Sequence, residues 1–193
     1  MTSLMEQTIA TLVRRVASPD PAPGAGPSLA WTCALAAGLV EMISAIELRK
    51  EPDDPAAVGA RRDRAAALSA RALELADEDV AAYSAVIATL ERRSEPGHGG
   101  RLRSALAQAA DPPMALVEVA AELASLAADG AHGARGAVRG EAVTAAVLAE
   151  AVARAGVPII ELNLGGARDD PRLARARELA DAARAGLDRA LAA

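Results

Sequence analysis

The stretch that decides the fold is "PSLAWTCALAAGLVEMISAIELRK", residues 27–50. It is rich in Ala, the strongest helix former, and ends on Arg49 and Lys50, which suit the negative end of a helix dipole. Pro27 suits a first helical position, where its missing N–H would have no partner. The stretch predicts a long helix from Pro27 to Lys50, buried between other helices. Because Glu41 interrupts the uncharged run before about 20 residues accumulate, we expect no membrane span.

Composition extends this prediction to the whole chain. The 193 residues are 52% hydrophobic, yet they contain no Phe, one Trp and one Tyr. The core must therefore be built from Ala, Leu, Val and Ile, and Ala lets helix axes approach closely. Length and composition predict one domain, residues 1–193, with an all-α fold: a bundle of about six to eight helices that includes long buried Ala-rich helices.

Charge and cysteine content exclude several classes of function. A formal net charge of −5 argues against nucleic-acid binding, which needs a basic surface. Cys33 is the only cysteine, so an internal disulfide is impossible and nothing suggests an oxidising compartment. The first residues carry Glu6 early and Arg14 and Arg15 late, the reverse of a signal peptide. We expect a cytoplasmic protein.

Apolar residues at steps of three and four predict the remaining helices. These are expected over residues 2–17, 56–93, 101–110, 114–128 and 142–155, with a last helix that Asp169 or Asp170 caps and Pro171 begins. In the first helix the apolar stripe comprises Leu4, Ile9, Leu12, Val13 and Val16. Pro112 and Pro113 are expected to end the helix 101–110, so that a new helix begins at residue 114. The run "VPIIELNL", residues 157–164, is compatible with a short extended segment or with a last buried turn.

Two features could carry function. The segment "PGAGPS", residues 23–28, leaves backbone N–H groups that could face an anion, or it is only a tight helix entry. It lacks the ending of a phosphate-binding loop and the third glycine of a dinucleotide fingerprint. Asp79 and Tyr83 lie four residues apart on one helix face, where they could hold a cation or transfer a proton, or form a solvated edge.

The histidines and serines point to no chemistry. His98 and His132 are expected to lie in glycine-rich loops, without neighbouring ligands at a suitable spacing, so we expect no metal site. No serine has a histidine at a spacing that indicates a hydrolytic triad.

Four stretches in order resemble the cyclodeaminase/cyclohydrolase family of folate enzymes over almost the whole chain. They are "PAPGAGPSLAWTCALAAGLVEMI", "DEDVAAYSAV", "ALAQAADPPMAL", and "GARGAVRGEAVTAAVLAEA" followed by "IIELNLGG". The family includes formimidoyltetrahydrofolate cyclodeaminases and methenyltetrahydrofolate cyclohydrolases. The resemblance implies an all-α homodimer that acts on a tetrahydrofolate derivative without a tightly bound cofactor.

The resemblance also implies site residues. The family opens on Pro-Gly-Gly-Gly-Ser, which Pro23, Gly24 and Gly26 match, with Ser28 standing one place late. Asp79 and Tyr83 match an acidic residue followed four places later by an aromatic one. On this basis the candidate substrate-binding residues are Pro23, Gly24, Gly26, Ser28, Tyr83 and Asn163, and the candidate catalytic residues are Asp79 and Glu141.

The chain departs from the family at the start and after the end of the expected helix 142–155. Arg139 and Gly140 occupy the places of a Ser-Asp pair, and Glu141 offers a carboxylate next door. Of the segment Asn-Val-Arg/Lys-Ile-Asn-Leu only Asn163 and Leu164 survive, while Glu161 stands in the basic place. The departures favour an alternative function: a catalytically degenerate homologue that binds a ligand or a partner protein.

Overall fold

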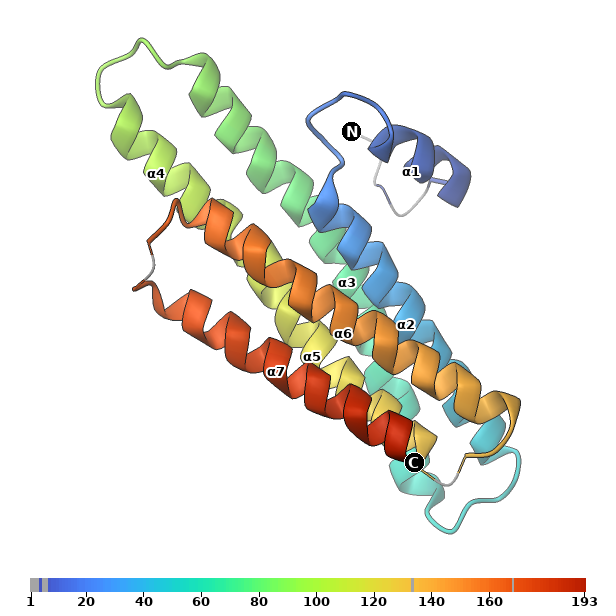
Figure 1. Ribbon diagram of the computed structural model, residues 1–193. Coiled ribbons are helices and arrows are strands. Elements are labelled where there is room, and N and C mark those ends of the chain that lie inside the picture. Colours follow the sequence, from blue (N-terminus) through green and yellow to red (C-terminus); the bar gives the residue numbers. More distant parts are fainter. Residues whose placement is uncertain (1–3, 5–6, 133, 168) are drawn as a thin grey trace.

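The computed structural model describes residues 4, 7–132, 134–167 and 169–193. Within them the chain forms α1 (Ile9–Val16), α2 (Ala25–Leu48), α3 (Pro55–Glu91), α4 (His98–Ala109), α5 (Asp111–Ala131), α6 (Ala137–Asn163) and α7 (Pro171–Ala192). The long helices lie roughly along one direction, and the pair α3–α4 extends beyond the others at one end (Figure 1). The prediction of an all-α bundle is confirmed.

The core is formed where α5 and α6 pack on each other, with α7 against both and with α2 against α3 and α6. Small side chains occupy the contacts: Ala36 and Ala37 of α2, Ala120 and Ala124 of α5, and Ala145 and Ala149 of α6 are all 0% exposed. Because Ala adds so little bulk, helix backbones approach closely, and larger residues such as Ile43 and Leu123 fill the remaining space. The long buried Ala-rich helices are thus present as predicted.

One position shows how close the helices lie. A Cβ built on Gly186 of α7 would lie 2.9 Å from the backbone carbonyl carbon and oxygen of Ala124 in α5. Backbone cannot move aside as a side-chain tip can, so we expect Gly186→Ala to separate α5 from α7 and to lower the free energy of unfolding by about 2 kcal/mol. Chemical denaturation measures this loss.

Gly140→Ala is the matched control, because a Cβ at Gly140 meets no atom within 4 Å. There the gain in helix propensity, about 0.5–1 kcal/mol, should leave the protein equally stable or more stable. Equal stability of the two variants would contradict the close approach of α5 and α7.

Prolines lie inside the first turns of helices and do not break them. Asp111 begins α5, so Pro112 and Pro113 are its second and third residues. The sequence suggested that Pro27 is the first residue of its helix. In the structure α2 begins at Ala25, so Pro27 is the third residue. The N–H groups of a first turn have no partner within their helix, so a proline costs nothing at any of these places. The expected break between two helices is present, but it lies at Ala110 and not at the prolines.

The helix expected at 142–155 is much longer in the structure. It begins at Ala137 and continues through Pro158 to Asn163, which settles the open choice for "VPIIELNL" in favour of helix. Pro158 is exposed, whereas Gly156 and Ile160 on either side of it are buried. A Cβ on Gly156 would lie 2.4 Å from Val117 Cγ2, so α6 is held tightly against α5 here. Tertiary packing thus outweighs the local cost of an interior proline.

The N-terminal helix differs most from the prediction. Thr2, its expected first residue, lies outside the described residues, and α1 begins only at Ile9. Of the predicted apolar stripe, Leu4 and Leu12 are buried, while Ile9, Val13 and Val16 are exposed. The stripe exists, but the bundle covers only part of it.

The remaining helix ends can be compared with the sequence in the same way. The helix α4 begins at His98, inside the glycine-rich segment that was expected to be a loop. Leu90, near the end of α3, is 43% exposed because this end of the helix projects beyond the bundle. The expected N-cap of the last helix is confirmed: Asp170 Oδ1 accepts a hydrogen bond from Arg172 N at 2.9 Å.

Two helices, α2 and α6, are long and apolar enough to cross a membrane by length and composition alone. Core helices of a bundle pass the same test, and both pack against other helices here. The expectation of no membrane span stays a prediction.

Candidate functional site

A cavity of about 220 Å³ lies where the segment before α2 meets α3, α4 and the end of α6. Its lining comprises Pro21, Ala22, Gly24, Ala25, Gly26, Asp79, Tyr83, Ala109, Ile159 and Asn163. Five of the eight candidate site residues line it, although they come from three segments that are far apart in the sequence. The fold thus brings most of the predicted site together.

Gly26 and Asp79 form the tightest contact in this cavity. A Cβ on Gly26 would lie 2.3 Å from Asp79 Oδ1 and 2.4 Å from Asp79 Cγ, so only glycine leaves room for the carboxyl group. Asp79 therefore lies directly against the first turn of α2, which has no side-chain cap. Gly26, predicted to bind substrate, is therefore needed to leave room for the carboxyl group of Asp79.

The pKa of the Asp79 carboxyl group is raised above its ordinary value. Burial disfavours the charged form and raises the pKa of Asp79 to about 6. No Lys, Arg or His belongs to the cavity lining, and no ion pair joins Asp79 to another described residue. The carboxylate can therefore interact with a ligand that carries a proton to donate or a positive charge.

Asn163 and Tyr83 complete the polar part of the lining. Asn163 is the last residue of α6, and its Nδ2 donates a hydrogen bond to the carbonyl oxygen of Ala109 at 2.8 Å. This bond ties α6 to the end of α4 and leaves the carboxamide oxygen and the second N–H of the side chain free. Tyr83 lies one turn after Asp79 and is 37% exposed, so it stands at the open side of the cavity.

Pro23 and Ser28, also predicted to bind substrate, do not line the cavity. Pro23 is buried behind the wall that Ala22 and Gly24 form. The hydroxyl of Ser28 donates to the carbonyl oxygen of Gly24 at 2.8 Å, so the helix backbone already uses it. Both residues shape the start of α2 without facing the ligand space.

Glu141, the second candidate catalytic residue, lies at the other end of α6. It precedes Asn163 by 22 residues in one continuous helix, a distance of about 33 Å at 1.5 Å per residue. Within one chain, therefore, Glu141 and Asp79 are not brought together. Sequence reasoning missed this separation because it ended the helix at residue 155.

The lining residues that sequence reasoning missed are Pro21, Ala22, Ala25, Ala109 and Ile159. Ile159 could have been found, because it lies four residues before Asn163 and shares its face once the segment is helical. Ala109 carried no signal, since only the packing of α4 on α6 brings it to the cavity.

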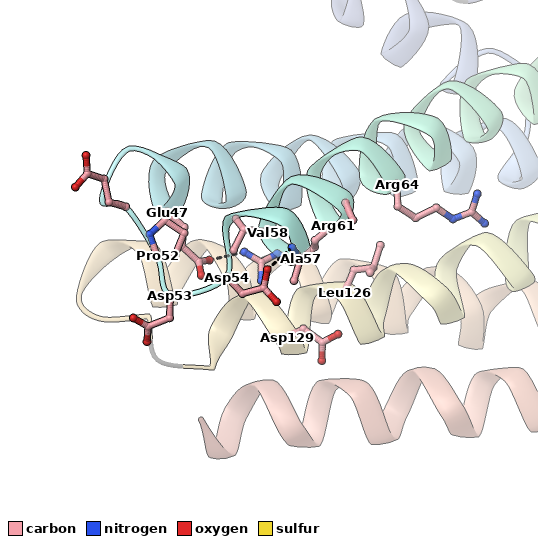
Figure 2. Close-up of a pocket in the computed structure, with 12 residues that line it drawn as sticks. Glu47, Pro52, Asp53, Asp54, Ala57, Val58, Arg61, Arg64, Leu126 and Asp129 are labelled. Atoms are coloured by element: carbon pink, nitrogen blue, oxygen red, sulfur yellow. Dashed lines mark hydrogen bonds and ion pairs between the residues drawn. The ribbon is translucent and has the colours of Figure 1, made fainter.

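A larger cavity, of about 700 Å³, lies at the opposite end of the bundle, between the end of α2, the start of α3 and α5 (Figure 2). Both arginines of its lining already have ion-pair partners. Arg61 forms an ion pair with Glu47 and donates from Nε to Ser44 Oγ at 3.0 Å, and Arg64 Nη2 contacts Glu122 at 2.6 Å. None of the predicted site residues belongs to its lining. We therefore place the candidate site at the smaller cavity.

No group of three or more His, Cys, Asp or Glu residues in the described ranges is placed to hold a metal ion. The polar chemistry available in the candidate site is therefore that of one unpaired carboxyl group, a phenol and a carboxamide oxygen.

Comparison with known proteins identifies the family and a similar fold. Residues 8–182 match the family model of formiminotransferase-cyclodeaminase. The fold is similar to that of the formiminotetrahydrofolate cyclodeaminase of Thermotoga maritima, with a TM-score of 0.82 and 22% sequence identity over 97% of this chain and 93% of that chain. No match was found among curated protein sequences. The resemblance seen in the sequence motifs is confirmed, and the chain belongs to the formiminotransferase-cyclodeaminase family.

Proposed function

We propose that the cavity around Asp79 binds a tetrahydrofolate derivative and that the protein acts on the one-carbon unit between N5 and N10. The reaction is that of a formiminotetrahydrofolate cyclodeaminase or of a methenyltetrahydrofolate cyclohydrolase. The observation that carries the proposal is Asp79: a half-buried carboxyl group without an ion-pair partner among the described residues, facing a cavity without a basic side chain. Family membership supports the folate substrate.

Both reactions need proton transfer next to a cationic carbon. In cyclodeamination N10 attacks the formimino carbon, N10 loses its proton, and the amino group leaves as ammonia after gaining one. In cyclohydrolysis water attacks the methenyl carbon, and breaking of the N5–carbon bond gives the 10-formyl compound. A carboxyl group with a pKa of about 6 can take up and return these protons near neutral pH. In its charged form it also stabilises the cation.

The dimensions of the cavity suggest how the ligand lies. At about 220 Å³ it is smaller than the roughly 300–1,000 Å³ that encloses a drug-sized ligand. We therefore place the ring system and its one-carbon bridge inside and the remainder of the folate outside. Tyr83 at the open side can stack on a ring, and the carboxamide oxygen of Asn163 can accept a hydrogen bond from a ring N–H.

The proposal needs no tightly bound cofactor. The substrate itself carries the one-carbon unit, and Asp79 supplies the proton transfer. Glu141 has no role at this cavity within one chain, because about 33 Å of α6 separates it from Asn163.

Binding without turnover is the alternative function, and one observation favours it. Glu161, which stands in the basic place of the family motif, forms an ion pair with Arg177 of α7 at 3.9 Å. An acidic residue there offers no contact for the acidic tail of a folate. A degenerate homologue would keep the cavity and lose the reaction.

Absorbance separates these functions. Purified protein is incubated with formiminotetrahydrofolate and, separately, with 5,10-methenyltetrahydrofolate, and the near-ultraviolet band of the methenyl compound is followed. Its appearance from the first compound identifies the cyclodeaminase, and its faster loss from the second identifies the cyclohydrolase. Rates equal to the spontaneous ones would rule out the enzyme. A folate-dependent rise in melting temperature would then support the binding function.

Assembly is the second part of the proposal: the protein is a soluble, cytoplasmic homodimer. Leu35 and Met42 of α2 and Val147 of α6 are 60%, 40% and 43% exposed, and α2 packs against α6. Exposed aliphatic groups on adjacent helices suit contact with a second copy. The net charge of −5 suits neither nucleic acid nor an anionic membrane.

A further inference from the structure

The end of α4 carries backbone carbonyl groups that need hydrogen-bond donors from elsewhere. The last four C=O groups of an α-helix have no donor within the helix, and the negative end of the helix dipole favours a positive charge nearby. The last turn of α4 contains no basic residue of its own. Ala109, its final residue, is buried, so its carbonyl group needs a partner from the protein. Other helices must supply the donors.

Two side chains from other helices reach the end of α4. Arg172, the second residue of α7, donates from Nη1 to the carbonyl oxygen of Ala107 at 2.8 Å. Asn163 of α6 donates from Nδ2 to the carbonyl oxygen of Ala109 at 2.8 Å. Since α4 packs mainly against α3 and makes little contact with α5 and α6, these two hydrogen bonds fix its end against the bundle.

The guanidinium group of Arg172 is itself held in one orientation. The two carboxylate oxygens of Asp170 accept from Nε at 3.1 Å and from Nη2 at 3.0 Å. Nη1 also donates to Oδ1 of Asp111, the first residue of α5, at 2.8 Å. A planar guanidinium group that is bound through both edges has a fixed direction. Arg172 therefore links the start of α7 to the junction between α4 and α5.

This junction forms part of the wall of the Asp79 cavity. Ala109 and Asn163 both line the cavity, and the hydrogen bond between them lies in its wall. Ala107 precedes Ala109 by two residues in the last turn of α4, so the positions of their carbonyl groups are coupled. Arg172 does not belong to the lining. Any effect of Arg172 on a ligand must therefore pass through the end of α4.

We infer that Arg172 is a positioning residue of the cavity: it fixes the end of α4 and, through the carbonyl group of Ala109, the orientation of the Asn163 carboxamide. The kinetic consequence rests on the proposed folate reaction, whereas the structural link does not. Asp79 and Gly26 lie on α3 and α2, so the reacting carboxyl group should stay in place without Arg172. Arg172 should therefore govern substrate affinity and leave the chemical step unchanged.

The side-chain amide of Asn163 reports on this link directly. Asn163 is the only asparagine of the chain, so labelling with ¹⁵N-asparagine gives one side-chain amide pair in the NMR spectrum. Arg172→Met keeps the apolar stem and removes the guanidinium group. We expect the chemical shifts of the pair to change and its exchange with solvent to become at least about tenfold faster, because the end of α4 opens more often.

Two further variants make the measurement specific. Arg175→Met removes an arginine from the next turn of α7, where it pairs with Glu178 of the same helix at 3.3 Å, and should leave the amide pair unchanged. Arg172→Lys keeps the charge but cannot match the planar contacts of the guanidinium group, so it should shift the pair less and in the same direction. It also carries the test if Arg172→Met does not fold, which circular dichroism shows.

Steady-state kinetics test the consequence for the reaction. With the folate substrate identified by absorbance, Arg172→Met should raise KM about 3- to 10-fold and leave kcat within about twofold. Asn163→Ser should also raise KM. The double variant should bind no more weakly than Asn163→Ser alone, because both changes act through the same carboxamide.

The outcomes keep the two proposals apart. An amide pair that Arg172→Met leaves unchanged overturns the inference, whether or not the protein turns over a folate. An equal change in Arg175→Met would reflect general loosening of α7 and would overturn it as well, as would additive losses in KM. An amide pair that responds as expected in a protein without turnover supports the positioning role and leaves the folate reaction as the part that fails.

Discussion

Asp79→Asn is expected to slow turnover of the folate substrate by about 10²–10⁴-fold and, at the same time, to stabilise the fold. The carboxamide keeps the size of the side chain but neither takes up a proton nor carries a charge. The stabilisation follows from burial, which raises the pKa of Asp79 to about 6 and so makes the ionised form unfavourable in the folded protein. Kinetics and chemical denaturation of the same variant measure both effects.

The raised pKa of Asp79 also predicts how the stability of the fold changes with pH. The carboxyl pKa is about 3.9 in an unfolded chain and about 6 in the fold, so between these values the folded protein binds more protons. Stability should therefore fall by about 2 kcal/mol as pH rises from 4 to 6, and Asp79→Asn should remove this loss. Turnover that needs the carboxylate should rise over the same range. A flat activity profile from pH 5 to 7 would exclude Asp79 as the acting base.

Glu78→Gln is the matched control, since it removes a carboxylate from the neighbouring position of α3. Glu78 is exposed and pairs with Arg71. Exposed pairs contribute about 0.2–1 kcal/mol, so this variant should lose a little stability and keep its turnover. Equal loss of activity in both variants would mean that the charge of α3, and not the cavity, governs the reaction.

Gly26→Ala is expected to reduce turnover about 100-fold with little loss of helix content. The added Cβ would lie 2.3 Å from Asp79 Oδ1, so the carboxyl group must rotate away from the first turn of α2. The helix itself accepts Ala readily, which confines the damage to the cavity. Steady-state kinetics and a thermal melt of the variant separate the two contributions.

Two variants make this prediction specific. Gly59→Ala changes a glycine of α3 at which a Cβ meets no atom within 4 Å, and it should retain full activity. The double variant Gly26→Ala/Asp79→Asn should be no slower than Asp79→Asn alone, because both changes remove the same carboxylate. Additive losses would show that Gly26 acts on the ligand directly and not through Asp79.

The middles of the helices could be predicted from sequence, and their ends could not. Apolar steps of three and four residues are local, and Ala favours helix wherever it stands. Pro112 was expected to end a helix and lies in the first turn of one, since a proline is tolerated at both places. The segment around Pro158 was compatible with an extended segment or with a last buried turn, yet packing of α6 on α5 at Gly156 accompanies a helix that continues past the proline.

The candidate site, too, could be predicted from sequence only in part. Asp79 and Tyr83 share a face because four residues separate them, which spacing alone predicts. Their meeting with Gly26 and Asn163 depends on three helices packing together, and no local pattern contains it. Glu141 shows the converse, because motif order placed it in the site while the unbroken α6 carries it away.

By itself the sequence determined that the chain is helical, that its core is built from small side chains, and that it resembles a family of folate enzymes. These properties follow from composition, periodicity and motif order, all of which can be read along one dimension. Only the tertiary structure decided where α6 ends, that Gly26 makes room for Asp79, and that Ile9 and Val13 of α1 are exposed within one chain. Each of these depends on distances between residues far apart in the chain, which packing of the helices sets.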